Sequence, residues 1–572
     1  MPDPTAAARL ATLAADYWEA TLEAQPVWGT IVGDRRFDDR LDDPTPTGRA
    51  AHRARLEALL GDVGTVGPDG LVGEDRVTRS ALLAQIESDL AADASGVDQW
   101  SVDPLEGPHI AALNLESIQP VDGPEQAGAM VARWNALGPW LDAHGENLRR
   151  ELAAGRVAVA SPVDKTLDEL EQTLSAPPDE LPFLAPLSVE RPSWTSEARS
   201  AFDAGLRAAV QDSILPALER YRAIVRDEIR PAARSDDRPG LCHVDGGGEA
   251  YARLIEVHTS LALAADEIHA IGLAEVERID AELAELGARV LGTGDLAAIR
   301  ERLRTDPALH FATRDEVFAK ADSALARSRD AIADWFGILP RAACEVVAMA
   351  AHEEAHSTIA YYRQPATDGS RPGRYYINTS APETRPRYEA EALAYHEAIP
   401  GHHLQLAIAQ ELTGLPEFRR HTGPTAFFEG WGLYTERLSD EMGLYSSDLD
   451  RIGVLSFDGW RASRLVVDTG MHALGWTRRQ AIDFMVDHSA LARNNIVNEV
   501  DRYIVWPGQA LAYKIGQREI LRLRAAAKQA LGPRFDIRAF HDAVLGHGAV
   551  GLATLSEIVG EWTAAAGVPV SR

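Results

Sequence analysis

The residues with the clearest chemical potential lie in the stretch YHEAIPGHHLQ, residues 395–405, where three histidines and a glutamate surround a Pro-Gly pair. Imidazole nitrogens and carboxylate oxygens are common zinc ligands, and a carboxylate beside them can serve as a general base. The stretch could therefore form a metal centre that activates water for hydrolysis. The alternatives are a helix end and histidines placed by chance.

The spacing of these histidines does not suit an unbroken helix. On such a helix His402 would point away from His396, and His403 would lie about 10 Å further along the axis. Pro400 removes a backbone donor and clashes with the preceding turn, and Gly401 permits unusual backbone conformations. A bend at this point could bring His402 back to His396, with His403 as the rival ligand.

A second motif, HEEAH, from His352 to His356, competes for the metal. Histidines at positions i and i+4 share one helical face, and the intervening glutamate can act as a base, as in the short motif of many zinc peptidases. However, Glu354 places a further charge where apolar packing is usual, and the strand-like STIAYY follows at once. We favour a surface turn between strands for this motif.

HEAIPGHHLQ and the downstream FFEGWGLYTE together resemble the bacterial domain-of-unknown-function family 885, which is grouped with zincin-like metallopeptidases. DGSRPGRYYIN, RLVVDTGMHALGW and RYIVWPGQALAYKIG support the resemblance, which covers most of residues 240–550. It implies a pattern His-Glu-x-x-Pro-Gly-His followed by Glu-Gly-Trp. In this chain the pattern falls on His396, Glu397, His402 and Glu429, and it does not include HEEAH.

These residue types suit a catalytic zinc ion, because two histidines and Glu429 form a standard ligand set that leaves one position open for water. Glu397 would then accept a proton from the water that the metal activates. Glu436, seven residues after Glu429, is the rival carboxylate, and we favour a role for it in orienting a ligand. We expect one Zn²⁺ per chain, although manganese, cobalt or iron would accept the same ligands.

Arg464, Asp468 and His472 recur every four residues and so share one face of a predicted helix. Arg464 could bind a terminal carboxylate of the substrate, and His472 could donate to the oxyanion of a catalytic step. The alternative is an internal Arg-Asp-His bridge that only stabilises the helix. In the functional interpretation Asp468, like His403, supports its neighbours without touching the substrate.

Further donors lie near the C-terminus, where Tyr503 and Gln509 are candidate substrate contacts and Tyr513 is a candidate oxyanion donor. A helical tyrosine is more often packed in the core. Asn378 ends the segment GRYYINTS, a predicted edge strand that could pair with the backbone of a bound peptide. Ordinary sheet packing is the alternative there.

The elements that must position these residues are mainly helical. In residues 270–286 the apolar side chains recur at helical spacing, with Glu275 and the other acids facing away. Residues 344–380 contain β-branched and aromatic runs separated by turn residues, which predict a small sheet. Pro-, Gly- and Asp-rich loops are expected near residues 61–75, 176–193 and 231–248.

We therefore expect a mainly α, zincin-like (gluzincin-type) metallohydrolase with a small inserted β-sheet and a central cleft. A helical N-terminal lobe is assigned to residues 1–340. A catalytic lobe follows at 341–572, with the sheet at 341–380 and the metal-site helices at 381–572. One continuous two-lobed domain is the alternative.

Composition restricts the partners. The chain has 572 residues, 45% apolar and 25% charged, and a formal net charge of −29, which argues against nucleic acid or anionic lipid as the main partner. We find no secretory signal and no apolar run of membrane-spanning length. Two cysteines exclude a disulfide framework. A cytoplasmic enzyme is expected, and a homodimer is left open.

The predicted function is zinc-dependent cleavage of amide bonds in short peptides or amino-acid conjugates. One alternative is hydrolysis of a non-peptide amide, ester or cyclic metabolite in a biosynthetic pathway by the same residues. The other is a metal-free helical binding protein, which metal content would distinguish.

Overall fold

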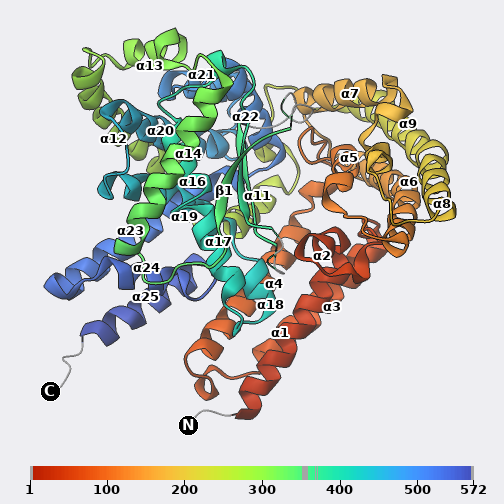
Figure 1. Cartoon of the computed structure of the whole chain (residues 1–572), viewed down its shortest axis with the longest axis horizontal. Coiled ribbons are helices and arrows are strands. Elements are labelled where there is room, and N and C mark those ends of the chain that lie inside the picture. The colour runs from red at the N-terminus through yellow and green to blue at the C-terminus, as the bar shows by residue number, and fades with distance from the viewer. Residues whose placement is uncertain (1–3, 351–353, 355–358, 367–368, 370, 568–572) are drawn as a thin grey trace.

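The computed structural model describes residues 4–350, 354, 359–366, 369 and 371–567, and these are mostly helical, as expected (Figure 1). The chain begins with four helices, of which α1 and α3 lie side by side. Thr45 caps the start of α3 by accepting a hydrogen bond from the Gly48 amide. The four are α1 (Pro4–Ala24), α2 (Pro26–Val32), α3 (Pro46–Gly64) and α4 (Glu74–Ser95).

A second group of helices forms a bundle with its own apolar core, at the right of Figure 1. The buried members of this core all come from residues 102–229, with Trp134 on α6 among the largest. The helices are α5 (Pro108–Ile118), α6 (Pro124–Ala153), α7 (Ala160–Ser175), α8 (Ser196–Ala209), α9 (Leu215–Ile224) and α10 (Arg230–Ala232).

Four helices connect this bundle to the sheet: α11 (Gly247–Thr259), α12 (Ala265–Val290), α13 (Leu296–Thr305) and α14 (Arg314–Ala331). The predicted helix at residues 270–286 lies within α12, and Val276, Ile279 and Leu283 are buried as expected. The three predicted loops fall between α3 and α4, between α7 and α8, and before α11.

The small sheet is present, but its strand order corrects one expectation. Strands β1 (Cys344–Ala348), β2 (Ala360–Arg363) and β3 (Gly373–Ile377) pair in the order β1-β3-β2, with β1 parallel and β2 antiparallel to β3. The segment GRYYINTS therefore supplies the central strand. The prediction that it is an edge strand is wrong, because both sides of β3 are already hydrogen-bonded to neighbouring strands and cannot pair with a peptide.

Helices resume after the sheet and run to the end of the described chain. Among them α20 is the most enclosed, with nearly every side chain from Ile452 to His472 buried. The helices are α16 (Ala390–Glu397), α17 (His402–Glu411), α18 (Glu417–His421), α19 (Thr425–Glu441), α20 (Asp448–His472), α21 (Arg478–His488), α22 (Arg493–Val505), α23 (Ala512–Leu531), α24 (Ile537–Leu545) and α25 (Leu552–Gly567).

Two long helix pairs organise this part of the molecule: α12 packs along α20, and α19 packs along α23. Gly430 and Gly516 permit the second pairing, because a Cβ atom on Gly430 would lie 2.5 Å from Gly516. One large buried cluster takes members from α1, α3 and α4, from α16 to α20 and from α23 to α25. Within the described residues, no helix is long and apolar enough to cross a membrane.

Candidate metal centre

The helix that carries the first histidine is interrupted where the sequence predicts it. Helix α16 ends at Glu397 and α17 begins at His402, with Ala398–Gly401 between them. A side chain at Gly401 could not be accommodated, because its Cβ would lie 1.9 Å from the carbonyl oxygen of His396. The interruption therefore depends on the Pro-Gly pair, and it folds His402 back toward His396.

Three potential ligands converge at this interruption. The imidazole ring centroids of His396 and His402 lie 4.6 Å apart and nearly perpendicular. Oε2 of Glu429, on α19, lies 3.5 Å from Nε2 of His396 and 3.6 Å from Nε2 of His402. Candidate ligand atoms of the three residues all lie within 4.8 Å of one another. One ion could contact all three.

Helix α19 contacts these residues through three positions spaced along one of its faces. Glu429 supplies the carboxylate, and Glu436 accepts a 2.8 Å hydrogen bond from Nδ1 of His396. Gly432, between them, leaves room for the imidazole, because a Cβ there would lie 2.7 Å from Cε1 of His396. The motif EGWGLYTE thus fixes the ring of His396 and directs its Nε2 toward Glu429.

The electrostatics of the group reflect its burial and its carboxylates. Burial lowers the pKa of His396, but hydrogen bonds to Glu429 and Glu436 outweigh this effect and raise the pKa to about 10. Burial raises the pKa of Glu429, whereas the two histidines hold it well below its ordinary value. The carboxylates of Glu429 and Glu436 beside the imidazole groups form an environment that favours a bound cation.

The residues fit a zinc ion by donor type. Two imidazoles and one carboxylate form a common catalytic set, and a carboxylate on the far nitrogen of a ligating histidine is the usual means of fixing its tautomer. Nδ1 of His402 is buried and has no hydrogen-bond partner among the described residues. The Nε2 atoms of His396 and His402, which face Glu429, have no other hydrogen-bond partner among the described residues.

His403 lies apart from the three candidate ligands. Its side chain is buried, with Nδ1 2.9 Å from the hydroxyl of Tyr362 and Nε2 3.2 Å from the carbonyl oxygen of Ala342. Burial lowers its pKa to about 4, so the ring is neutral at physiological pH. It connects α17 to the sheet and offers no free nitrogen.

The competing HEEAH motif is mostly outside the described residues, including His352 and His356. Glu354 is described, and it is buried and paired with Arg314 and with the hydroxyl of Thr379. The carbonyl oxygen of Glu354 accepts a hydrogen bond from Nδ2 of Asn378, whose Oδ1 accepts from Ser380. The candidate substrate contact Asn378 is thus a buried residue that organises the end of β3.

Glu397, the candidate base, directly follows His396 at the end of α16 and is half-buried. It makes no hydrogen bond to a described residue, so its carboxylate is available to a ligand. Tyr375, on β3, lies close enough that Glu397 contributes to raising its pKa, after the larger effect of burial. The hydroxyl of Tyr375 is also buried without a described partner. Tyr375 was not singled out from the sequence.

Arg464, Asp468 and His472, all within the described part of α20, bind other residues and do not form the internal bridge that was the alternative interpretation. Asp468 accepts hydrogen bonds from the Tyr251 hydroxyl and the Gly508 amide, and burial raises its pKa to about 7. His472 is fully buried and uses both ring nitrogens on backbone groups, at Leu241 and Tyr503. His472 lies eleven residues, or about 16 Å, along the helix from Arg461, the α20 residue that approaches Glu436.

Arg464 instead pairs with residues of α22. Its Nε donates to the Tyr503 hydroxyl at 2.8 Å, and its Nη2 donates to Glu499 at the same distance. The Arg464 guanidinium also lies 4.3 Å from the ring centroid of Tyr513. Gln509 accepts a hydrogen bond from Arg502, which also contacts the Tyr513 hydroxyl. These four candidates therefore form one polar cluster.

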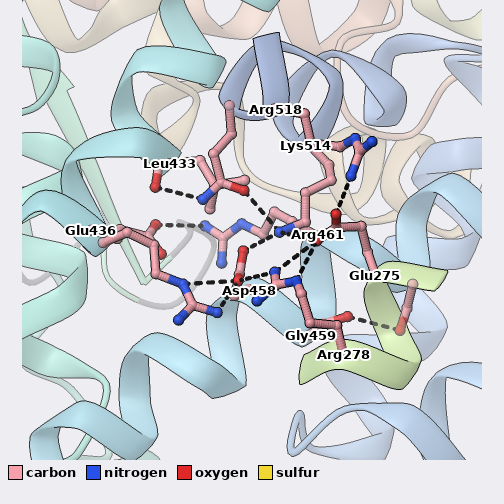
Figure 2. A network of polar contacts seen from close by, with 12 residues as sticks. Glu275, Arg278, Leu433, Glu436, Asp458, Gly459, Arg461, Lys514 and Arg518 are labelled. Atoms are coloured by element: carbon pink, nitrogen blue, oxygen red, sulfur yellow. Dashed lines mark hydrogen bonds and ion pairs between the residues drawn. The ribbon is translucent and has the colours of Figure 1, made fainter. Parts of the chain in front are cut away.

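Arg461 connects this cluster to the three candidate metal ligands through Glu436. The sequence pattern did not indicate Arg461. Arg461 lies three residues before Arg464 on α20, and its Nη2 approaches Glu436 Oε1 at 3.9 Å (Figure 2).

Figure 2 also shows a second network, in which Asp458 binds Lys514. Glu275 was expected to face away from the core, but it is buried and pairs with Arg278 and Arg518.

A recess of about 570 Å³ opens beside this second network, lined by Glu275, Arg278, Arg437, Asp458, Gln517 and Arg518 among others. None of the three candidate metal ligands lines it. The expected central cleft at the metal group stays a prediction.

Comparison of the sequence with models of known protein families identifies the family of this chain. The model of the family described as bacterial protein of unknown function (DUF885) matches residues 26–559, so the chain belongs to this family. A search of the curated proteins found no match.

Two solved structures share the fold. A candidate lipoprotein from Colwellia psychrerythraea matches with a TM-score of 0.90 and 27% identity over 98% of this chain and 99% of its own. A candidate lipoprotein of unknown function from Shewanella oneidensis matches with a TM-score of 0.75 and 18% identity over 96% and 99%. Those descriptions apply to those proteins, and the cytoplasmic location of this chain stays a prediction.

A chain described as a candidate oligoendopeptidase F from Bacillus anthracis str. Ames matches with a TM-score of only 0.30 and 11% identity, over 90% of this chain and 94% of its own. At that level of similarity it carries no argument about fold or activity.

Proposed function

We propose that the chain is a zincin-like, zinc-dependent hydrolase that cleaves amide bonds in short peptides or amino-acid conjugates. The observation that carries the proposal is the convergence of His396, His402 and Glu429, with ligand atoms within 4.8 Å of one another. Glu397 is adjacent to His396 in the chain and close enough to interact electrostatically with it. This combination supplies both the ligands and the base that metal-assisted hydrolysis requires.

Each residue has a distinct role in the proposed reaction. His396, His402 and Glu429 would hold the ion, and Glu436 keeps the proton of His396 on Nδ1 so that Nε2 presents a lone pair. Zinc, when bound, polarises the substrate carbonyl and makes water more acidic. Glu397 accepts the proton of the attacking water and returns it to the leaving amine nitrogen.

Burial of the group supports a small or extended substrate. The side chains of His396, His402 and Glu429 are only 4%, 13% and 21% exposed. A folded protein surface could not reach these residues without displacing the surrounding helices, whereas a short peptide or conjugate needs little space. Esters and cyclic amides would use the same residues and belong in the substrate panel.

The test combines metal content with turnover on the full chain. Purified protein should carry one equivalent of zinc and hydrolyse members of a panel of dipeptides, tripeptides, N-acyl amino acids and esters. Glu397→Gln should keep the zinc and lose the turnover, whereas Glu441→Gln, an exposed carboxylate on α19, should keep both. A protein that binds no zinc and cleaves nothing in the panel would be the metal-free binding protein of the alternative hypothesis.

A further inference from the structure

Two arginines on α20 lie buried beside the proposed metal centre. Arg461 and Arg464 are only 5% and 1% exposed, and their spacing of three residues puts them on the same side of the helix. Their guanidinium carbons lie 4.1 and 4.4 Å from the ring centroid of Trp460. The aromatic ring therefore fixes both charged groups in place.

The hydrogen-bond donors of these arginines are incompletely used. Within the part of the chain that the structure describes, Nε and Nη1 of Arg461 and Nη1 of Arg464 are buried without a partner. The remaining Arg461 nitrogen, Nη2, is 3.9 Å from Glu436, which is too long for a hydrogen bond. Buried donors on a cation are costly to leave unpaired, so this arrangement favours an acceptor that comes from a ligand.

The charges around the arginines also favour an anionic ligand. Arg464 and Arg502 both pair with the single carboxylate of Glu499. Arg461 has Glu436 as its nearest carboxylate, and that group already accepts the proton of His396. Among the described residues, only the carboxylates of Glu436 and Glu499 lie within 4 Å of the three arginines Arg461, Arg464 and Arg502, so the cations outnumber their direct partners. A planar carboxylate matches the fork of a guanidinium group.

Arg461 lies close to the proposed metal ligand His396, so an anion bound by Arg461 would lie near the proposed reaction site. Oε1 of Glu436 is 2.8 Å from Nδ1 of His396 and 3.9 Å from Nη2 of Arg461, so one carboxylate oxygen links the two side chains. Figure 2 shows the Glu436–Arg461 contact. In a C-terminal residue the carboxylate lies within roughly 4 Å of the amide nitrogen that precedes it. Arg461 is also close enough to Glu429, a proposed metal ligand, for that carboxylate to raise its pKa, although burial has the larger, lowering effect. A substrate of that kind could therefore extend from Arg461 to the proposed metal centre.

We propose that Arg461 and Arg464 bind the free carboxylate of the substrate, so that the enzyme cleaves the amide bond preceding a C-terminal amino acid. This inference rests on the proposed function and names its substrate class. Water adds to the carbonyl carbon, the C–N bond breaks, and the leaving nitrogen takes the proton held by Glu397. The products are a carboxylic acid and a free amino acid.

The first test measures binding alone. Hippurate, an acylated glycine with a free carboxylate, is titrated by calorimetry into the full-length protein, with its neutral amide, hippuramide, as the comparison ligand. Because hippurate contains the amide bond that the enzyme would cleave, the wild type and every variant in this titration also carry Glu397→Gln, which removes the proposed base. Hippurate should bind at least 10-fold more tightly than hippuramide to wild type. The preference should disappear in Arg461→Met and Arg464→Met, and it should persist in Arg518→Met, an exposed arginine of the neighbouring network (Figure 2).

The second test measures turnover on a cleaved peptide and the same peptide with a C-terminal amide. Wild-type kcat/KM should be at least 100-fold lower for the amide, and Arg461→Met should reduce that ratio to near one. Zinc content and thermal unfolding are recorded for each variant. Should Arg461→Met fail to fold, the wild-type preference and its loss in Arg464→Met decide the question.

Two outcomes would overturn the proposal: a wild type that does not distinguish hippurate from hippuramide, or a preference that both arginine variants retain. In the second case Arg461 only balances the charge of Glu436. Failure of the proposed hydrolase function would instead show as absence of zinc and of all turnover, whatever the carboxylate preference.

Discussion

Substitution of Gly432 by alanine tests the geometry of the proposed metal centre with one added methyl group. The new Cβ would lie 2.7 Å from Cε1, 2.9 Å from Nε2 and 3.0 Å from Nδ1 of His396, whereas ordinary contacts begin at 3.4 Å. The ring must therefore move by at least about 0.7 Å, beyond the roughly 0.2 Å that zinc–ligand distances tolerate. We expect zinc affinity to fall at least 10- to 100-fold, or about 1.4–2.7 kcal/mol.

Gly432→Ala should lower the free energy of unfolding, although a glycine-to-alanine change within a helix ordinarily raises it. Alanine stabilises a helix interior by about 1 kcal/mol over glycine, and Gly560→Ala on α25, where nothing lies within 4 Å, should show that gain. Gly432→Ala should instead lose about 1–3 kcal/mol through overpacking. Zinc titration against a competing chelator and urea unfolding measure both effects. Unchanged zinc affinity in Gly432→Ala would refute the position of the His396 ring.

Three other substitutions test separate parts of the account. Glu436→Gln should weaken zinc binding 10- to 100-fold in a chelator competition because it removes the charged acceptor of His396, and Glu441→Gln should not. Glu397→Gln should keep one equivalent of zinc in elemental analysis while kcat falls about 100- to 10,000-fold; equal turnover would exclude it as the base. Burial raises the pKa of Asp468 from its ordinary 3.8 to about 7, so its protonated form is favoured in the folded state. The free energy of unfolding of wild type, relative to Asp468→Asn, should therefore be highest below pH 4 and fall by up to about 4 kcal/mol as the pH rises to 7. Urea unfolding at several pH values measures this difference, and a constant difference would contradict the burial argument.

The features that local chemistry determines could be predicted from the sequence. Proline breaks or kinks a helix interior. The break between α16 and α17, at Pro400 and Gly401, could therefore be predicted from these two residues alone. The aromatic and β-branched runs likewise indicated the small sheet.

Features that depend on distant packing could not be predicted in the same way. The order of the strands depends on where β1 meets β3, and nothing within GRYYINTS reveals that it is central. His402 and His403 are adjacent, and only the packing of α17 between α19 and the sheet directs one toward Glu429 and the other toward Tyr362.

The arginine cluster shows a limit of periodic reasoning. A spacing of four residues drew attention to Arg464, Asp468 and His472, yet these side chains bind different partners. Arg461, at a spacing of three from Arg464, is the one that approaches Glu436. A search for all charged residues within three or four positions on a largely apolar helix would have included it.

The most direct test of the central claim is the zinc content of purified wild type, His396→Ala, His402→Ala and His403→Ala, measured by elemental analysis. His403→Ala is the matched control, because it removes the adjacent imidazole, which contacts Tyr362 and Ala342 and not Glu429. The account predicts one equivalent of zinc in wild type and His403→Ala and little or none in the other two variants. Retention of zinc in His396→Ala and His402→Ala would show that the metal binds elsewhere and would contradict the proposed centre.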